Sequence, residues 1–201
     1  MLDSGVVCSC SHTEGEFISP IFLVPKADGS KRFILNLKKL NCYVDHEHFK
    51  IEDMRVVKRL VEFGSNFASI DIQDAYWHVP IHSSHRKYLR FNFQDQLYEF
   101  MCLPFGLSSA PRAFTKLMKP VVSLLRQQGL MSVIYLDDLL LLASTWVSCN
   151  LNVQKTIQLL NFLGFTIKKC KSCLFSSQKI TFLGFELNSI NGTIRLPLNK
   201  H

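Results

Sequence analysis

Two adjacent aspartates, Asp137 and Asp138, interrupt an otherwise apolar run that covers residues 133–143. Apolar runs of this length are typical of buried strands, so the stretch predicts a hairpin with both aspartates at its tip. Carboxylates that are partly removed from water cost on the order of several kcal/mol each unless a positive charge compensates them. Hard oxygen ligands favour Mg²⁺, with Mn²⁺ possible, so the pair predicts a divalent metal site. The alternative interpretation is an ordinary hairpin with a solvated Asp-Asp turn.

A third acid, Asp71, favours the metal site over that alternative. It falls at the end of a β-like run over residues 67–72, where alternate residues share one face of a strand. A carboxylate that leaves one strand meets a pair at a hairpin tip only when the two strands are neighbours in one sheet. We therefore expect the strand of Asp71 to lie beside the hairpin of Asp137 and Asp138.

A second hairpin is predicted near the start of the chain. Two β-rich runs, residues 21–24 and 33–37, flank an Asp28-Gly29 pair, which is a strong short hairpin signal. Lys26 and Arg32 lie close to its tip, where like charges repel one another unless a phosphate-bearing ligand lies between them. The alternative is a solvated hairpin edge that resists aggregation.

Three amphipathic helices are expected around these strands. Apolar residues recur at helical spacing over residues 51–63. Ser109 is a suitable N-cap for a second helix that ends at Gly129, and Pro120 should kink that helix or loosen one of its turns. A third helix is expected over residues 150–163.

The remaining segments complete the order of elements. Residues 180–187 predict two short β pieces hinged at Gly184, and residues 1–16 are polar and read as irregular. The succession of hairpins, helices and single strands predicts an α+β fold with helices packed on one face of a largely antiparallel sheet.

Composition limits the function classes. The chain has 201 residues, of which 47% are hydrophobic, so it can bury a core and is not disordered. A formal net charge of +7 fits a polyanionic partner, most simply nucleic acid. No apolar stretch reaches the roughly 20 residues of a membrane span, so no membrane partner is expected. Seven cysteines, an odd number, without an apolar leader favour an intracellular location, cytoplasmic or nuclear.

Six motifs stand out by their order and spacing. They are Ser19-Pro-Ile-Phe-Leu-Val-Pro-Lys26 with Asp28-Gly-Ser-Lys-Arg32, Ser69-Ile-Asp71-Ile-Gln-Asp-Ala-Tyr76, Leu103-Pro-Phe-Gly-Leu-Ser-Ser-Ala-Pro111, Tyr135-Leu-Asp137-Asp138, the lysine segment near Lys171, and Phe182-Leu-Gly-Phe185. Together they resemble the fingers and palm of a retroelement reverse transcriptase. The resemblance covers about residues 17–198, and the motifs are most similar to those of retrotransposon enzymes of the tyrosine-recombinase or long-terminal-repeat groups.

The resemblance implies a fold and a division of the chain. It implies a right-hand polymerase palm together with β-rich fingers. Residues 17–46 and 79–109 would form the fingers, residues 47–78 and 110–190 the palm, and residues 191–201 the start of a linker to a thumb. The thumb itself is expected to be absent from this chain, and the remaining polyprotein domains, thumb and ribonuclease H, are expected in the full element.

The resemblance also implies residue roles. Asp71, Asp137, Asp138 and the Ile72 carbonyl would hold two Mg²⁺ ions, with Lys171 as a general acid. A deoxynucleoside triphosphate would be bound by Lys26, Arg32, Asp74, Ala75, Tyr76, Phe105 and Gly106. The primer grip would be Leu183, Gly184 and Phe185. Two departures stand out: Phe105 occupies a position where retroviral enzymes carry glutamine, and Asn36-Leu-Lys38 replaces an acidic-aromatic-arginine triplet that would support Arg32.

Two functional hypotheses follow. The first is an RNA-directed DNA polymerase core that extends a primer on an RNA or DNA template by a two-metal mechanism. The second is a catalytically silent nucleic-acid-binding remnant of such an element. The intact set of three aspartates favours the first, because repelling carboxylates have no value once the metals are lost.

Overall fold

The computed structural model describes residues 1–25, 29, 31–45 and 47–197. Lys26 and Asp28, predicted at the tip of the basic hairpin, lie outside these residues. The chain forms two compact units. Unit 1 comprises Met1–Phe49 and Tyr76–Phe114, and unit 2 comprises Lys50–Ala75 and Thr115–His201. The units divide at 49/50, 75/76 and 114/115. The resemblance implies boundaries between fingers and palm at 46/47, 78/79 and 109/110, which differ from these by three to five residues.

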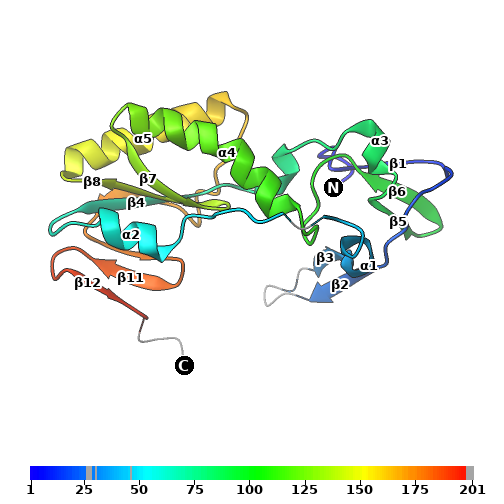
Figure 1. Cartoon of the computed structure of the whole chain (residues 1–201), viewed down its shortest axis with the longest axis horizontal. Coiled ribbons are helices and arrows are strands. Elements are labelled where there is room, and N and C mark those ends of the chain that lie inside the picture. Colours follow the sequence, from blue (N-terminus) through cyan, green and yellow to red (C-terminus); the bar gives the residue numbers. More distant parts are fainter. Residues whose placement is uncertain (26–28, 30, 46, 198–201) are drawn as a thin grey trace. The chain divides into compact units, whose positions relative to one another are not determined.

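Unit 1 is rich in short antiparallel strands (Figure 1). The predicted basic hairpin is present as two paired strands in the register Ile21↔Leu35 to Pro25↔Lys31. The elements of this unit are β1 (Val7–Ser9), β2 (Ile21–Pro25), β3 (Lys31–Leu35), α1 (Lys38–Asn41), α3 (Ser83–Arg86), β5 (Arg90–Phe93) and β6 (Gln96–Phe100). A 3₁₀ turn, η1 (Ala75–His78), begins at the last residue of a unit 2 segment.

The prediction that residues 1–16 are irregular is wrong for Val7–Ser9. Strand β1 pairs antiparallel with β6, and Val6 and Val7 are buried. Farther along, Glu16 binds the buried Arg90 guanidinium at 2.6 Å, and Glu99 binds it at 2.9 Å. The segment is held by contacts with residues 74 to 93 positions later, which no local pattern reveals.

Unit 2 is built on a four-stranded antiparallel sheet in the order β7-β8-β4-β9. As predicted, the strand that ends at Asp71 lies beside the hairpin of the two aspartates. The elements are α2 (Met54–Leu60), β4 (Asn66–Asp71), α4 (Ala110–Gln127, whose first turn belongs to unit 1), β7 (Met131–Tyr135), β8 (Asp138–Ala143), α5 (Trp146–Phe162), β9 (Cys173–Ser177), β10 (Lys179–Phe182), β11 (Phe185–Asn188) and β12 (Thr193–Arg195).

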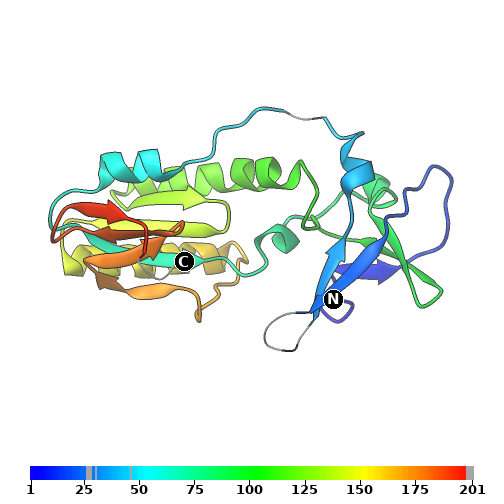
Figure 2. The same ribbon diagram turned by 90° about the horizontal axis from the view of Figure 1, so that it is seen from below.

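Both faces of the unit 2 sheet are covered. Helices α4 and α5 lie on one face, whereas α2 and the β10-β11-β12 sheet lie on the other (Figures 1 and 2). The expectation of helices on one face only is therefore wrong for α2. Its Val57 is fully buried in a cluster with side chains of β4, β7 and β8, so this short helix covers the face that the long helices leave open.

Local capping explains where the helices differ from their predicted bounds. Helix α2 begins at Met54 because the Asp53 side chain accepts the Arg55 backbone N–H at 2.8 Å. Helix α5 begins at Trp146, earlier than predicted, because Thr145 and Ser148 form a capping box. Helix α4 begins directly after Ser109, as expected, and runs through Pro120.

The end of the described chain is more ordered than expected. The prediction of a linker over residues 191–201 is wrong for Thr193–Arg195, which forms β12 and pairs with β11. Ile194 packs against the apolar core of unit 2, which explains why the segment joins the sheet.

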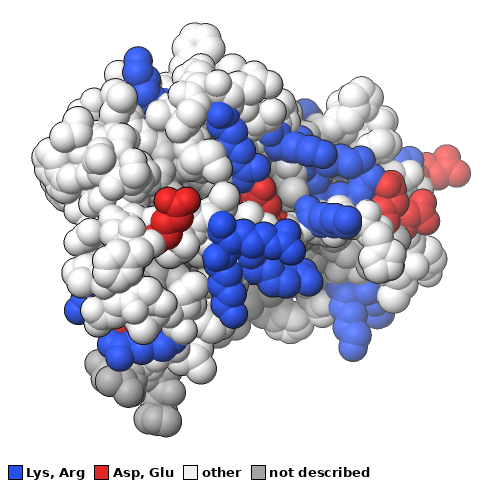
Figure 3. Space-filling view, turned by 60° about the vertical axis from the view of Figure 1, so that its left-hand side comes forward, with Lys and Arg blue, Asp and Glu red and all other residues white. Residues whose placement is uncertain are grey.

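One face of the molecule carries several groups of basic side chains. Figure 3 shows Lys and Arg side chains in several groups, with fewer acidic side chains among them. Within the described parts of the chain, none of the helices is both long enough and apolar enough to cross a bilayer.

Candidate active site

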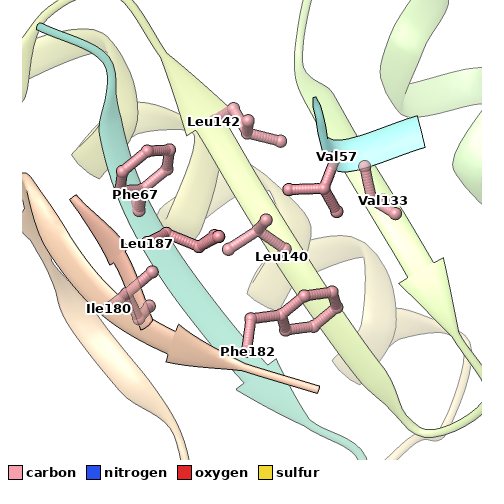
Figure 4. Close-up of a cluster of buried hydrophobic side chains, with 8 residues drawn as sticks. All are labelled: Val57, Phe67, Val133, Leu140, Leu142, Ile180, Phe182 and Leu187. Atoms are coloured by element: carbon pink, nitrogen blue, oxygen red, sulfur yellow. The ribbon is translucent and has the colours of Figure 1, made fainter. Parts of the chain in front are cut away.

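The three aspartates come together through strand register. Asp71, the last residue of β4, is the Cα partner of Asp138, the first residue of β8. Tyr135 is also paired with Asp138, so Leu136 and Asp137 form a two-residue hairpin loop. Paired residues of an antiparallel sheet point to the same face. Asp71 and Asp138 thus share the face that carries the apolar cluster in Figure 4, which includes Leu140.

The hairpin loop holds an unusual backbone conformation. Leu136 has φ +54°, whereas Asp137 does not have a positive φ. This combination matches a type II′ turn, in which glycine is the usual residue at the first central position. A leucine there costs on the order of 1–3 kcal/mol, and such costs are found at functional sites more often than elsewhere.

The segment that follows α5 fastens the end of β4. The Asp71 backbone N–H donates to Ser172 Oγ at 3.0 Å, and the Asp71 carbonyl accepts the Lys168 N–H at 2.9 Å. On the other side, the Ile72 N–H donates to the Asp137 carbonyl at 2.9 Å. In an extended segment the N–H and C=O of one residue point the same way, so the Ile72 carbonyl faces the aspartate hairpin. No backbone N–H of the described residues donates to that carbonyl.

Burial and mutual repulsion make ionisation of the aspartates in this site unfavourable. Burial, together with the nearby carboxylates of Asp137 and Asp71, raises the pKa of Asp138 from 3.8 to about 6, and Lys171 opposes this change. Burial also raises the pKa of Asp71, which Lys171 lowers and Asp137 raises. Lys171 Nζ lies 3.9 Å from Asp71 Oδ2. The acids are held near one another at a cost that a bound cation would remove.

The donor set suits a hard divalent cation, since it offers carboxylate oxygens and a backbone carbonyl. The three carboxylates, however, do not form a complete metal-coordination site. Within the part of the chain that the structure describes, no three His, Cys, Asp or Glu side chains stand close enough together to hold a metal ion. The backbone thus places Asp71, Asp137 and Asp138 side by side, while their carboxylates remain spread.

The predicted nucleotide-binding residues are divided between the units. Unit 1 holds Arg32, Tyr76, Phe105 and Gly106. Tyr76 is buried, and its ring centroid lies 5.0 Å from that of Phe105 and 5.8 Å from that of Phe114. Phe105 is half exposed, and Arg32 lies exposed on β3.

The other predicted residues lie in unit 2 at turns. Asp74 has φ +46° and is followed by the buried Ala75. Leu183 and Gly184, with φ +48° and +79°, form the turn between β10 and β11, and Phe185 begins β11.

Two positioning contacts were missed by the sequence interpretation. Ser172 carries no motif signal, although its hydroxyl holds the Asp71 backbone. The Asn41 side chain donates to the Gly106 carbonyl at 2.9 Å and accepts the Ser108 N–H at 2.9 Å. It therefore clamps the loop that carries Phe105, at a sequence separation too large for a local pattern.

Comparison with known families agrees with this arrangement. The family model described as "Reverse transcriptase (RNA-dependent DNA polymerase)" matches residues 24–187. The chain therefore belongs to the reverse transcriptase family.

Individual relatives refine the placement. The chain is 25% identical over 192 residues to an enzymatic polyprotein of figwort mosaic virus, covering 94% of the chain and 28% of the relative. It is 28% identical over 175 residues to that of cauliflower mosaic virus, covering 85% and 25%. A transposon Tf2-3 polyprotein of Schizosaccharomyces pombe is 22% identical over 169 residues, covering 84% and 12%. The chain is thus related to long-terminal-repeat retrotransposon and pararetrovirus polyproteins, and these relatives do not support the tyrosine-recombinase group.

Solved structures agree on the fold. A foamy viral protease-reverse transcriptase in complex with double-stranded DNA superposes with a TM-score of 0.79 at 26% identity, covering 94% of this chain and 32% of that one. A foamy viral protease-reverse transcriptase in complex with an RNA/DNA hybrid gives a TM-score of 0.78 at 24% identity, covering 98% and 25%. The chain spans about a quarter or less of the length of the first two curated relatives and the transposon polyprotein, so their whole activities include more than this chain.

Proposed function

We propose that this chain is the polymerase core of a retroelement reverse transcriptase, adding deoxynucleotides to a primer 3′-hydroxyl on an RNA or DNA template. The observation that carries the proposal is the register pair of Asp71 and Asp138, with Asp137 in the adjoining loop. Unit 2 would be the palm and unit 1 the fingers. A template with its primer is the proposed partner, supported by the double-stranded DNA named for the foamy viral relative.

Asp71, Asp137, Asp138 and the Ile72 carbonyl are the proposed ligands of two divalent cations. When bound, such a pair stabilises the attacking and the leaving oxygen of nucleotidyl transfer. Side-chain rotation, without a change in strand register, would gather the carboxylates. Lys171, near Asp71, would give a proton to the leaving pyrophosphate, and its charge offsets part of the carboxylate repulsion.

The remaining predicted residues would bind and select the nucleotide. Arg32, together with Lys26, would contact phosphate oxygens, for which the planar guanidinium is suited. The amides of Asp74 and Ala75 would donate to the triphosphate, and Tyr76, backed by Phe105 beside Gly106, would lie against the sugar. Leu183, Gly184 and Phe185, at the β10–β11 turn, would grip the primer.

The test is the variant Asp137→Asn, compared with Glu62→Gln, which removes an exposed negative charge in the same unit. The parent and the control should extend a primer on a homopolymer template with Mg²⁺ or Mn²⁺. The Asp137 variant should remain folded and bind the same primer–template, but it should not extend it, because an amide cannot replace a carboxylate ligand. Extension by this variant at about a tenth of the parental rate or more, which is at most about 1.4 kcal/mol of lost stabilisation, would contradict the assignment.

The same assay addresses the alternative function. A parent that binds primer–template but extends it with neither cation is the result expected of a catalytically silent remnant. Because the chain spans only part of its relatives, that result should be repeated with a longer polypeptide that includes the proposed thumb.

A further inference from the structure

Strand β7 is an outer strand of the unit 2 sheet as described. An outer strand presents backbone N–H and C=O groups that have no strand partner. On β7 these include the Ser132 carbonyl and the Ile134 N–H, which point to the same edge because residues two apart in a strand do so. Both groups have side-chain partners.

An ion pair between Glu52 and Arg126 supplies those partners. Arg126 donates to the Ser132 carbonyl from Nε at 3.2 Å and from Nη2 at 2.6 Å. Glu52 Oε2 accepts the Ile134 N–H at 3.0 Å. The two side chains are bound together, since Arg126 Nη2 lies 2.7 Å from each Glu52 carboxylate oxygen. The pair therefore offers β7 one donor and one acceptor, as the backbone of a neighbouring strand would.

Three elements converge on this edge. Arg126 lies in the last turn of α4, where a cation is favoured by the helix dipole. Glu52 directly precedes Asp53, the N-cap of α2. Helix α2 is in turn anchored by Val57, which is buried in one cluster with Val133 of β7. The ion pair thus fixes β7 relative to both helices.

We propose that the Glu52–Arg126 pair substitutes for a neighbouring strand along β7 and thereby positions the hairpin that carries Asp137 and Asp138. Ile134 is followed directly by Tyr135, the Cα partner of Asp138. If the outer edge of β7 moves at Ile134, the turn that begins two residues later, at Leu136, therefore moves with it. The relevance of this positioning to catalysis rests on the proposed function, whereas the positioning itself does not.

The variants separate backbone capping from simple charge pairing. Glu52→Ala removes the acceptor for Ile134, whereas Glu52→Gln keeps an oxygen that can accept the same N–H. The double exchange Glu52→Arg with Arg126→Glu restores an ion pair, but it puts a carboxylate beside the Ser132 carbonyl and a guanidinium beside the Ile134 N–H. Glu186→Ala is the matched control, since it breaks the 2.8 Å pair with Arg195 in the same unit without touching β7.

The measurement is amide hydrogen exchange across residues 131–139 of the metal-free full chain, with thermal unfolding in parallel. We expect Glu52→Ala to speed exchange by about tenfold or more at Ile134 and across residues 135–139, and the double exchange to do the same. Glu52→Gln and Glu186→Ala should stay within about threefold of the parent over these residues. Faster exchange confined to Ile134, or protection restored by the double exchange, overturns the proposal. If Glu52→Ala unfolds unit 2, the comparison of Glu52→Gln with the double exchange decides.

Primer extension then tests the effect of this positioning on catalysis separately from the positioning itself. Faster exchange at residues 135–139 together with a lower kcat and an unchanged nucleotide KM is the result expected for a positioning pair. The same exchange result in a chain that never extends a primer leaves the positioning intact and counts against the proposed function alone.

Discussion

Asp138→Asn should stabilise the metal-free protein, and the gain should depend on pH. Burial and the carboxylates of Asp137 and Asp71 raise the pKa of Asp138 from 3.8 to about 6 in the folded state. The native state then binds this proton more tightly than the unfolded state does. Stability is therefore lost as the pH rises from below 3.8 to above about 6, and the asparagine variant escapes that loss.

The magnitude follows from the two pKa values. Their difference, at about 1.36 kcal/mol per pH unit, gives at most about 3 kcal/mol at neutral pH. Asp138 keeps part of its contact with solvent, so screening lowers the expected gain to about 1–2 kcal/mol. Near pH 4 only a small part of the gain should remain, because the native Asp138 is then protonated and the unfolded-state carboxyl, with a pKa of 3.8, is only about half ionised.

Urea unfolding in the presence of a chelator, followed at about pH 4, 6 and 8, measures this difference. Glu62→Gln is the control, since it makes the same change in net charge at an exposed site of the same unit. A gain of equal size at all three pH values, or a loss of stability near pH 8, would refute the assignment of like-charge and burial strain to Asp138. Added Mg²⁺ should stabilise the parent more than the variant, because the variant lacks one proposed ligand.

Three further predictions follow from contacts in unit 1. Tyr76→Val should admit ribonucleotides about tenfold more readily, or about 1.4 kcal/mol, while Tyr76→Phe, which keeps the ring against Phe105, should not; equal discrimination in an active Tyr76→Val enzyme would show that Tyr76 is not the gate. Asn41→Ala should destabilise by about 1–3 kcal/mol and raise the nucleotide KM by freeing the loop at Gly106; an unchanged KM would show that the clamp is structural only. Arg90→Ala should cost about 3–5 kcal/mol in urea unfolding because it leaves two acids without their partner, and a cost below about 1 kcal/mol would contradict a buried hub.

The sequence predicts the centre of the site because its pattern is local. The apolar runs around Asp137 define a hairpin, the alternation before Asp71 defines a third strand, and the need to bring three acids together makes this strand a neighbour of the hairpin. The structure confirms this pairing. The spread of the carboxylates could not be read from the pattern, since it depends on side-chain rotation rather than on strand register.

The errors arise where distant contacts or caps decide the structure. Strand β1 exists because β6 offers it a partner about 90 residues away, although β1 itself is only three residues long. The start of α2 is set by the Asp53 cap, which overrides the helical spacing of the residues before it. Glu52 and Arg126 are 74 positions apart, so their joint hold on β7 has no local signature.

The position of β4 in its sheet has a consequence for how the protein is made. Strand β4 is complete at Asp71, yet both of its partners, β8 and β9, are synthesised later, and the last of them ends at Ser177. Both edges of this apolar strand are unpaired on the nascent chain until β8 is made, and one edge stays unpaired until β9 is made. Such edges can pair with other chains. The pairing of residues as distant as Phe67 and Ser177 also slows folding. The chain between them loses conformational entropy before the stabilising contacts form. Synthesis that stops before residue 177 would therefore release a polypeptide prone to aggregation, whereas the complete sheet has β4 enclosed on both sides.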